Sequence, residues 1–139
     1  MEVKKMRFIS TRVHGILDYL VGALLVVAPW LFNFDNGGAE TWVPVIVGIV
    51  VLLQAMMTNY ELGVFKTMSM KTHLTMDFIM GIFLAASPWI FNFDEYIWEP
   101  HVLFGLISVA ASLMTRAVPD HVHSRHTVNN PINPLDNRL

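Results

Sequence analysis

The sequence predicts an all-α membrane protein with four transmembrane helices, built as two copies of one two-helix unit. Three observations lead to this prediction. Hydrophobic residues make up 54% of the 139-residue chain and charged residues only 14%, against roughly 25% charged residues in an ordinary soluble domain. The apolar residues are gathered in four long stretches. Short motifs in the first half of the chain return in the second half, and such a repeat defines the architecture.

The four apolar stretches approach the roughly 20 residues that a helix needs to span a bilayer. They cover about residues 13–34, 41–58, 73–93 and 100–118. A soluble four-helix bundle would need a polar stripe along each helix, whereas Gln54 is the only polar side chain from Val45 to Met57. The first stretch does not end in a small-residue cleavage site, so we expect it to stay as a signal anchor.

The repeat is carried by two motifs that occur twice in the same order. These are His14–Asp18 with His73–Asp77, and Pro29–Asp35 with Pro88–Asp94. Each copy holds two helices, so both copies insert in the same direction. The expected relation is a pseudo-two-fold axis along the membrane normal, with two parallel repeats. We divide the chain into a basic N-terminus (1–12), a first repeat (13–60), a connector (61–72), a second repeat (73–118) and a polar tail (119–139).

The distribution of charge predicts the orientation in the membrane. All nine Lys and Arg residues lie in the N-terminus, in the connector or after the fourth helix, and the hairpin loops 35–41 and 94–99 carry only acidic charges. The positive-inside rule therefore predicts that both termini and the connector lie on the cytoplasmic side of the plasma membrane. Aromatic residues at the opposite edge predict an interfacial belt; these are Trp30, Trp42, Trp89, Trp98, Phe32, Phe34, Phe91, Phe93 and Tyr96.

The Pro-Trp pairs, Pro29-Trp30 and Pro88-Trp89, predict helix ends with interfacial anchors, because proline removes a backbone donor and cannot continue a regular helix. Asn33 and Asn92 suit the turns that follow. Ser87 can satisfy a carbonyl oxygen that the proline leaves free, as hydroxyl groups do in broken membrane helices. We interpret all of these residues as structural.

The motif Ala86-Ser87-Pro88-Trp89, set in a repeated two-helix unit, resembles the SPW-repeat family of small bacterial integral membrane proteins. The resemblance covers about residues 13–118, although the first copy has Ala28 in place of the serine. It implies a four-helix bacterial membrane protein and implies no established activity.

The two His-x-x-x-Asp motifs are the candidate functional residues. A spacing of four places His14 with Asp18, and His73 with Asp77, on one face of each helix. Ionisable groups inside a membrane usually face the bundle interior, so the four side chains are expected to converge. They could form structural His–Asp hydrogen bonds, bind a divalent metal such as Zn²⁺ or protons, or ligate haem through the two histidines. We expect the structural role, with modest and additive losses of stability on substitution to alanine.

The remaining sequence offers little chemistry. Three histidines of the tail, His121, His123 and His126, could chelate metal, but a solvated tail is expected. The many methionines suit packing better than copper(I) binding. Cysteine is absent, which excludes disulfides and thiol catalysis. No phosphate-binding loop, nucleophile motif or nucleic-acid patch is present, so neither a catalytic activity nor a cofactor is predicted.

These observations predict a structural, interaction or accessory subunit in the lipid bilayer. We expect it to act as a homo-oligomer or as part of a larger membrane complex. The alternative is a small transporter, linked to metal ions or protons, that uses the paired His–Asp motifs.

Overall fold

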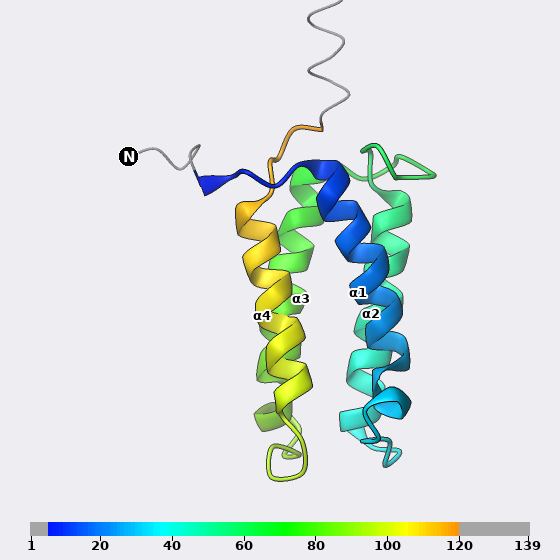
Figure 1. Ribbon diagram of the computed structural model, residues 1–139, viewed down its shortest axis with the longest axis vertical. Coiled ribbons are helices and arrows are strands. Elements are labelled where there is room, and N and C mark those ends of the chain that lie inside the picture. Colours follow the sequence, from blue (N-terminus) through cyan, green and yellow to red (C-terminus); the bar gives the residue numbers. More distant parts are fainter. Residues whose placement is uncertain (1–5, 120–139) are drawn as a thin grey trace, which may run out of the picture.

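The computed structural model describes residues 6–119, which form four helices lying side by side and alternating in direction (Figure 1). The helices are α1 (Thr11–Leu31), α2 (Ala39–Met57), α3 (Met70–Ile90) and α4 (Glu99–Met114). Within the described residues, extended structure is limited to two isolated β-bridges. The all-helical fold predicted from the sequence is confirmed.

Serine residues begin both helices that carry the His–Asp motifs. The Oγ of Ser10 accepts a hydrogen bond from the backbone N–H of Val13, and the Oγ of Ser69 accepts one from Thr72, each at 3.2 Å. A serine at this position satisfies one of the free N–H groups of the first helical turn. The helices consequently begin a few residues earlier than the apolar stretches of the sequence.

Both long helices end in the same kind of turn after the Pro-Trp pair. Asn33 and Asn92 adopt left-handed backbone conformations, with φ of 57° and 55°, which asparagine tolerates better than most residues. The next residue then donates its N–H to the proline carbonyl oxygen, at 2.8 Å in each case. In α3 the Ser87 hydroxyl donates to the carbonyl oxygen of Leu84 at 2.7 Å, the acceptor that Pro88 leaves without its helical donor.

Glycines allow close packing within each hairpin. A Cβ atom added to Gly48 of α2 would lie 2.7 Å from the carbonyl oxygen of Gly22 in α1. A Cβ atom on Gly105 of α4 would lie 2.5 Å from the carbonyl oxygen of Gly81 in α3. Both distances are too short for a side chain, so backbones meet directly, as is common between membrane helices.

The two hairpins meet along an apolar core and through the segments that precede α1 and α3. α1 packs mainly on α2 and α3 mainly on α4, with fewer contacts between the hairpins. The inter-hairpin core contains Leu25, Val43, Val47, Val51, Leu84 and Phe104. At the connector end, Ile9 pairs with Thr115 and Met68 with Thr58 in isolated bridges.

Three helices, α1 to α3, are long and apolar enough to cross a membrane. α4 is shorter than the predicted stretch 100–118, because it ends at Met114. Its 16 residues correspond to about 24 Å of helix, compared with a hydrocarbon core of about 30 Å.

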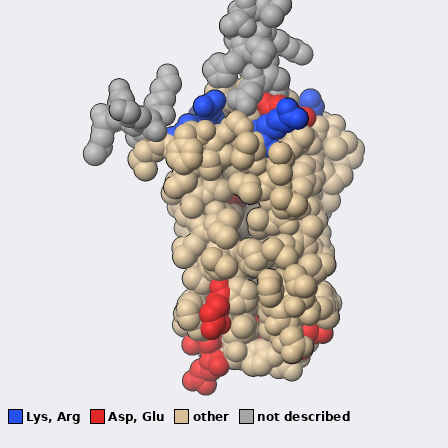
Figure 2. Space-filling view, in the orientation of Figure 1, with Lys and Arg blue, Asp and Glu red and all other residues tan. Residues whose placement is uncertain are grey.

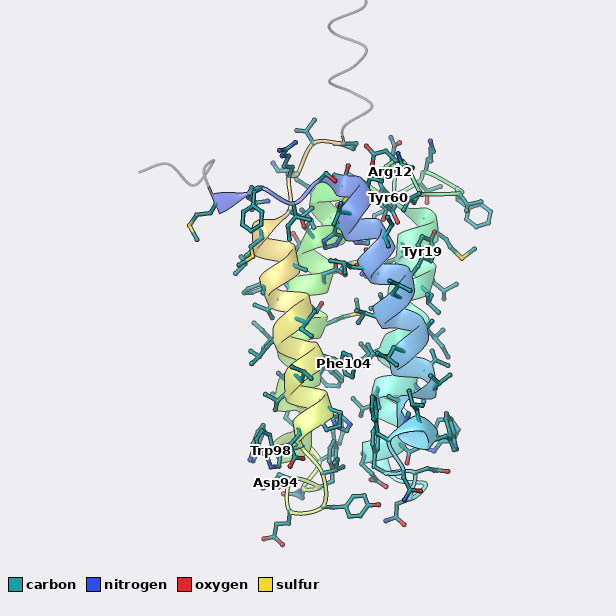
Figure 3. The ribbon with its side chains drawn as sticks, in the orientation of Figure 1. Arg12, Tyr19, Tyr60, Asp94, Trp98 and Phe104 are labelled. Atoms are coloured by element: carbon teal, nitrogen blue, oxygen red, sulfur yellow. The ribbon has the colours of Figure 1, made fainter. Side chains whose placement is uncertain are left out.

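Basic residues and most acidic residues lie at opposite ends of the bundle, and the tryptophans lie at the acidic end. Lys and Arg side chains gather at the connector end and most acidic ones at the other (Figure 2), and Figure 3 shows Arg12 and Trp98 near opposite ends. The four tryptophans are about half exposed, as an interfacial belt requires. The assignment of Phe34 and Phe93 to that belt is wrong, because both are buried and pack on the His101 ring with centroids 5.5 and 4.9 Å away.

Candidate functional site

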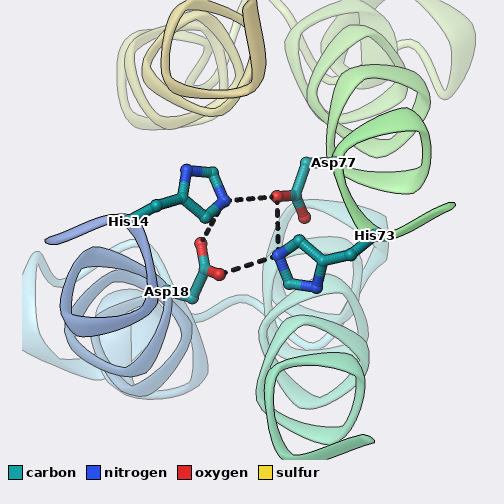
Figure 4. Close-up of side chains that lie close together, drawn as sticks. All are labelled: His14, Asp18, His73 and Asp77. Atoms are coloured by element: carbon teal, nitrogen blue, oxygen red, sulfur yellow. Dashed lines mark hydrogen bonds and ion pairs between the residues drawn. The ribbon is translucent and has the colours of Figure 1, made fainter. Parts of the chain in front are cut away.

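The structure brings the four predicted His and Asp side chains together between α1 and α3 (Figure 4). We call this set, His14, Asp18, His73 and Asp77, the His–Asp cluster. The i,i+4 spacing aims each pair at the bundle axis, and helix packing brings the two faces into contact. Exposed fractions are 1% and 0% for the histidines, 8% for Asp18 and 2% for Asp77, so the cluster lies in the interior.

The shortest contacts in the cluster connect the two helices. His14 Nε2 lies 2.9 Å from Asp77 Oδ2, and His73 Nε2 lies 2.9 Å from Asp18 Oδ2. Within one helix, His14 Nε2 lies 3.3 Å from Asp18 Oδ1, and His73 Nε2 lies 3.0 Å from Asp77 Oδ2. Each imidazole therefore faces both carboxylates through the same nitrogen.

The other nitrogen of each ring, Nδ1, is hydrogen-bonded to one threonine. Thr115 Oγ1 lies 2.8 Å from His14 Nδ1, and Thr58 Oγ1 lies 2.8 Å from His73 Nδ1. The threonines follow α4 and α2 directly, where the β-bridges with Ile9 and Met68 hold the backbone. Each histidine is thus positioned by the opposite hairpin.

The threonine contacts assign the histidine tautomer. Each threonine oxygen also lies 2.6 Å from a carbonyl oxygen in its preceding turn, that of Gln54 or Ala111. A carbonyl only accepts, so the single hydroxyl hydrogen is used there. The threonine oxygen then accepts from Nδ1–H of the histidine. Each Nε2–carboxylate contact consequently requires either a further hydrogen or a cation between the two atoms.

Asp77 receives additional support that Asp18 does not share. The side-chain amide of Gln54 donates to Asp77 Oδ1. Ser108 donates to the backbone carbonyl oxygen of Asp77 at 3.0 Å.

A cavity of about 30 Å³, lined by both aspartates and by apolar residues such as Met80 and Ala111, adjoins the cluster. A space of this size accommodates about one water molecule.

Tyr60 closes the cluster from the connector side. Its ring lies 6.2 Å from the His73 ring, measured between centroids, and it is fully buried. Gly15 makes room for it, because a Cβ atom there would lie 2.1 Å from the tyrosine ring. Burial raises the pKa of the Tyr60 hydroxyl above its ordinary value, so this group stays neutral.

Sequence reasoning identified the four cluster residues but missed Gln54, Thr58 and Thr115 as their partners. The signals were present: Gln54 is the one polar side chain in its stretch, and Met-Thr closes both repeats. The Pro-Trp motifs lie at the far end of the bundle and take no part in the cluster. Haem does not fit between the histidines, because the two carboxylates occupy that space. The tail histidines lie outside the described residues.

Comparisons with known proteins give one match. The family model described as the SPW repeat domain matches residues 12–115, which is most of the chain and includes the whole His–Asp cluster. No curated protein matches, and no solved structure matches.

Proposed function

The chain belongs to the SPW repeat family, and we propose that it is a non-catalytic integral membrane protein with a structural or accessory role. The observation that carries the proposal is that hydrogen bonds of the His–Asp cluster connect the two hairpins. Each imidazole bonds to the aspartate and to the threonine of the other hairpin. The polar interior therefore acts as a junction that holds two apolar hairpins together as one body.

The protein crosses the plasma membrane four times, with both termini in the cytoplasm and its two repeats related by a pseudo-two-fold axis along the membrane normal. The end-to-end separation of charge supports this orientation (Figure 2). α4 is short, but the backbone groups at its end are paired: Ile9 donates to the Met114 carbonyl, and Arg116 donates to the Ile9 carbonyl. Inside a bilayer, backbone N–H and C=O groups have to be hydrogen-bonded within the protein, and these pairs meet that requirement.

Labelling of single cysteines tests the orientation, and the native chain contributes none. Gly37→Cys places a thiol in the α1–α2 loop and Ser124→Cys places one in the tail. An impermeant thiol reagent added to intact cells is expected to label Gly37→Cys but not Ser124→Cys. The opposite pattern would show that the orientation is reversed.

The functional role implies partners besides lipid, either further copies of the chain or other membrane proteins. The connecting loops are short, and large exposed apolar side chains cover the helices along their length. Purification in a mild detergent followed by native mass spectrometry is expected to yield a stable homo-oligomer or a larger complex. Monodisperse single chains that move Zn²⁺ or H⁺ across liposome membranes would instead establish the transporter alternative.

A further inference from the structure

We infer that the His–Asp cluster is a binding site for one divalent metal ion, and for Zn²⁺ in particular. The inference rests on the proposed structural role of the same cluster, because the ion would bridge α1 and α3. One ligand atom from each of the four side chains can be chosen so that all lie within 4.8 Å of one another. Two imidazole nitrogens and two carboxylate oxygens are donors that Zn²⁺ accepts in a tetrahedral site.

The nitrogen–oxygen distances in the cluster are close to those between neighbouring ligands of a small tetrahedral ion. The four N···O separations in the cluster run from 2.9 to 3.3 Å. Ligand atoms placed about 2.0 Å from a tetrahedral ion are about 3.3 Å apart. The four candidate ligand atoms lie within 4.8 Å of one another, and the two histidines face different oxygens of Asp18. Accepting the metal therefore requires the Asp18 carboxylate to present one oxygen and the four ligand atoms to rearrange from these positions into a tetrahedron.

The histidine tautomer is the one that a metal requires. Nδ1–H of each ring is committed to a threonine oxygen, so the neutral imidazole carries its lone pair on Nε2. Both Nε2 atoms point toward the carboxylates at the centre of the cluster (Figure 4). One divalent ion would also neutralise two aspartates that are otherwise costly to bury in a membrane.

The outer partners match those of metal sites. A histidine that ligates a metal almost always donates its second N–H to an oxygen, which fixes the orientation of the ring. Thr115 and Thr58 provide that oxygen for His14 and His73, and Gln54 orients the carboxylate of Asp77. This arrangement appears on both histidines independently, from two different helix ends.

The donor set favours zinc over other abundant divalent ions. Mg²⁺ and Ca²⁺ require six or more ligands, nearly all of them oxygen, and the cluster offers two imidazoles with two carboxylates. Imidazole nitrogen suits Zn²⁺, and four protein ligands drawn from histidine and carboxylate groups match the coordination number that zinc adopts in structural sites. The adjoining cavity leaves room for about one water molecule as an additional ligand.

Metal titration of the full chain in mild detergent tests the inference. The reference protein carries His121→Ala, His123→Ala and His126→Ala, and has no purification histidines, so that only the cluster is measured. After treatment with a chelator, Zn²⁺ alone is added, and bound zinc and melting temperature are recorded. We expect one zinc per chain and a rise in melting temperature. Both should be lost in His14→Ala and in Asp18→Asn.

Two further variants separate ligation from general loss of structure. His101→Ala is the matched control, because this buried histidine bonds to the Glu40 carbonyl oxygen outside the cluster; it should keep full zinc binding. Thr58→Val retains all four ligands and removes the acceptor of His73 Nδ1–H, together with the hydroxyl hydrogen bond to the Gln54 carbonyl oxygen. Its affinity for Zn²⁺ should fall about 10–100-fold, which decides the question even if His14→Ala fails to fold.

The inference is wrong if the reference protein binds no zinc, or if Thr58→Val and Asp18→Asn bind it as well as the reference does. A reference protein that binds no zinc but still forms a larger assembly would refute the metal site and leave the structural role intact. Single chains that bind zinc, form no assembly and transport the ion would support the metal site and refute the structural role.

Discussion

The α1–α2 and α3–α4 hairpins carry the same polar side chains at the His–Asp cluster but different side chains around it. The shared pairs are Ser10 and Ser69, His14 and His73, Asp18 and Asp77, and Thr58 and Thr115. The shortest histidine contacts, at 2.8 and 2.9 Å, each join one residue from each hairpin. Both hairpins therefore have to supply the same atoms, because a change in one would leave a buried polar group of the other without its partner.

The apolar surroundings follow a different rule. In the first hairpin, Gly15 of α1 faces the large ring of Tyr60. At the matching places in the second hairpin, Leu74 belongs to a buried cluster against which Ala117 packs. Small and large residues are thus exchanged between the matching places, Gly15 with Leu74 and Tyr60 with Ala117, and Tyr60 and Leu74 share one buried cluster. Packing needs the summed volume to be right and does not need the same residue at each place.

The largest effect is expected from breaking this compensation. Gly15→Leu forces a side chain into the position of the Tyr60 ring, only 2.1 Å from the new Cβ atom, and should destabilise the protein by about 3 kcal/mol. Combining it with Tyr60→Ala places the leucine and alanine of the second hairpin at these positions and should recover part of that loss, since Tyr60 also packs with Met70 and Leu74. Thermal unfolding in mild detergent, followed by circular dichroism, measures both.

Ile16→Ala, at an exposed neighbouring position, serves as the control and should change stability little. A double variant no more stable than Gly15→Leu alone would show that the two hairpins do not compensate volume in this way.

The next effect concerns the polar junction in the absence of metal. His14→Ala and His73→Ala should each cost about 1–2 kcal/mol in the presence of a chelator. The sequence led us to expect additive losses, but both imidazoles contact the same oxygen, Asp77 Oδ2, at 2.9 and 3.0 Å. We now expect the double variant to depart from additivity by about 0.5 kcal/mol or more. Strict additivity in a double-mutant cycle would mean that the shared oxygen does not couple the rings.

A smaller effect should follow from Gln54, a polar residue at the cluster that the hairpins do not share. Gln54 bonds to Asp77, whereas its counterpart near Asp18 is Ala111, at the edge of the small cavity. Gln54→Ala should cost about 1 kcal/mol, and Gln54→Glu more, because it adds a third buried carboxylate. Ala111→Gln should be tolerated. Chemical denaturation of the three variants side by side compares them, and equal losses at both positions would contradict the asymmetry.

The smallest difference lies at the Pro-Trp ends. Ser87→Ala removes the hydroxyl bound to the Leu84 carbonyl oxygen and should cost about 0.6 kcal/mol, the average for hydrogen bonds between groups in membrane helices. Ala28→Ser introduces the same hydroxyl before Pro29 and should cost nothing or stabilise slightly. The melting temperatures of the two variants measure this, and a larger loss for Ala28→Ser than for Ser87→Ala would refute the comparison.

The fold and the family were predictable because they depend on local features of the chain. Long apolar stretches predicted helices; the structure confirms that the fold is all-helical, and the SPW repeat match confirms the family. The helix ends were predicted less well: α4 stops at Met114, where Thr115 leaves the helix to pair with Ile9. Phe34 and Phe93 were misplaced because composition does not distinguish an aromatic ring facing lipid from one packed on a buried histidine.

The sequence by itself determined that each His–Asp pair lies on one helix face, because a spacing of four residues does so in any α-helix. Only the tertiary structure decided which groups bond to one another. Spacing alone would have allowed each histidine to pair with the aspartate of its own helix. Instead, the shortest bonds run between helices, because Thr58 and Thr115 hold each ring by Nδ1 and turn Nε2 toward the opposite carboxylate. That choice depends on where α2 and α4 end in space, which no local pattern in the sequence specifies.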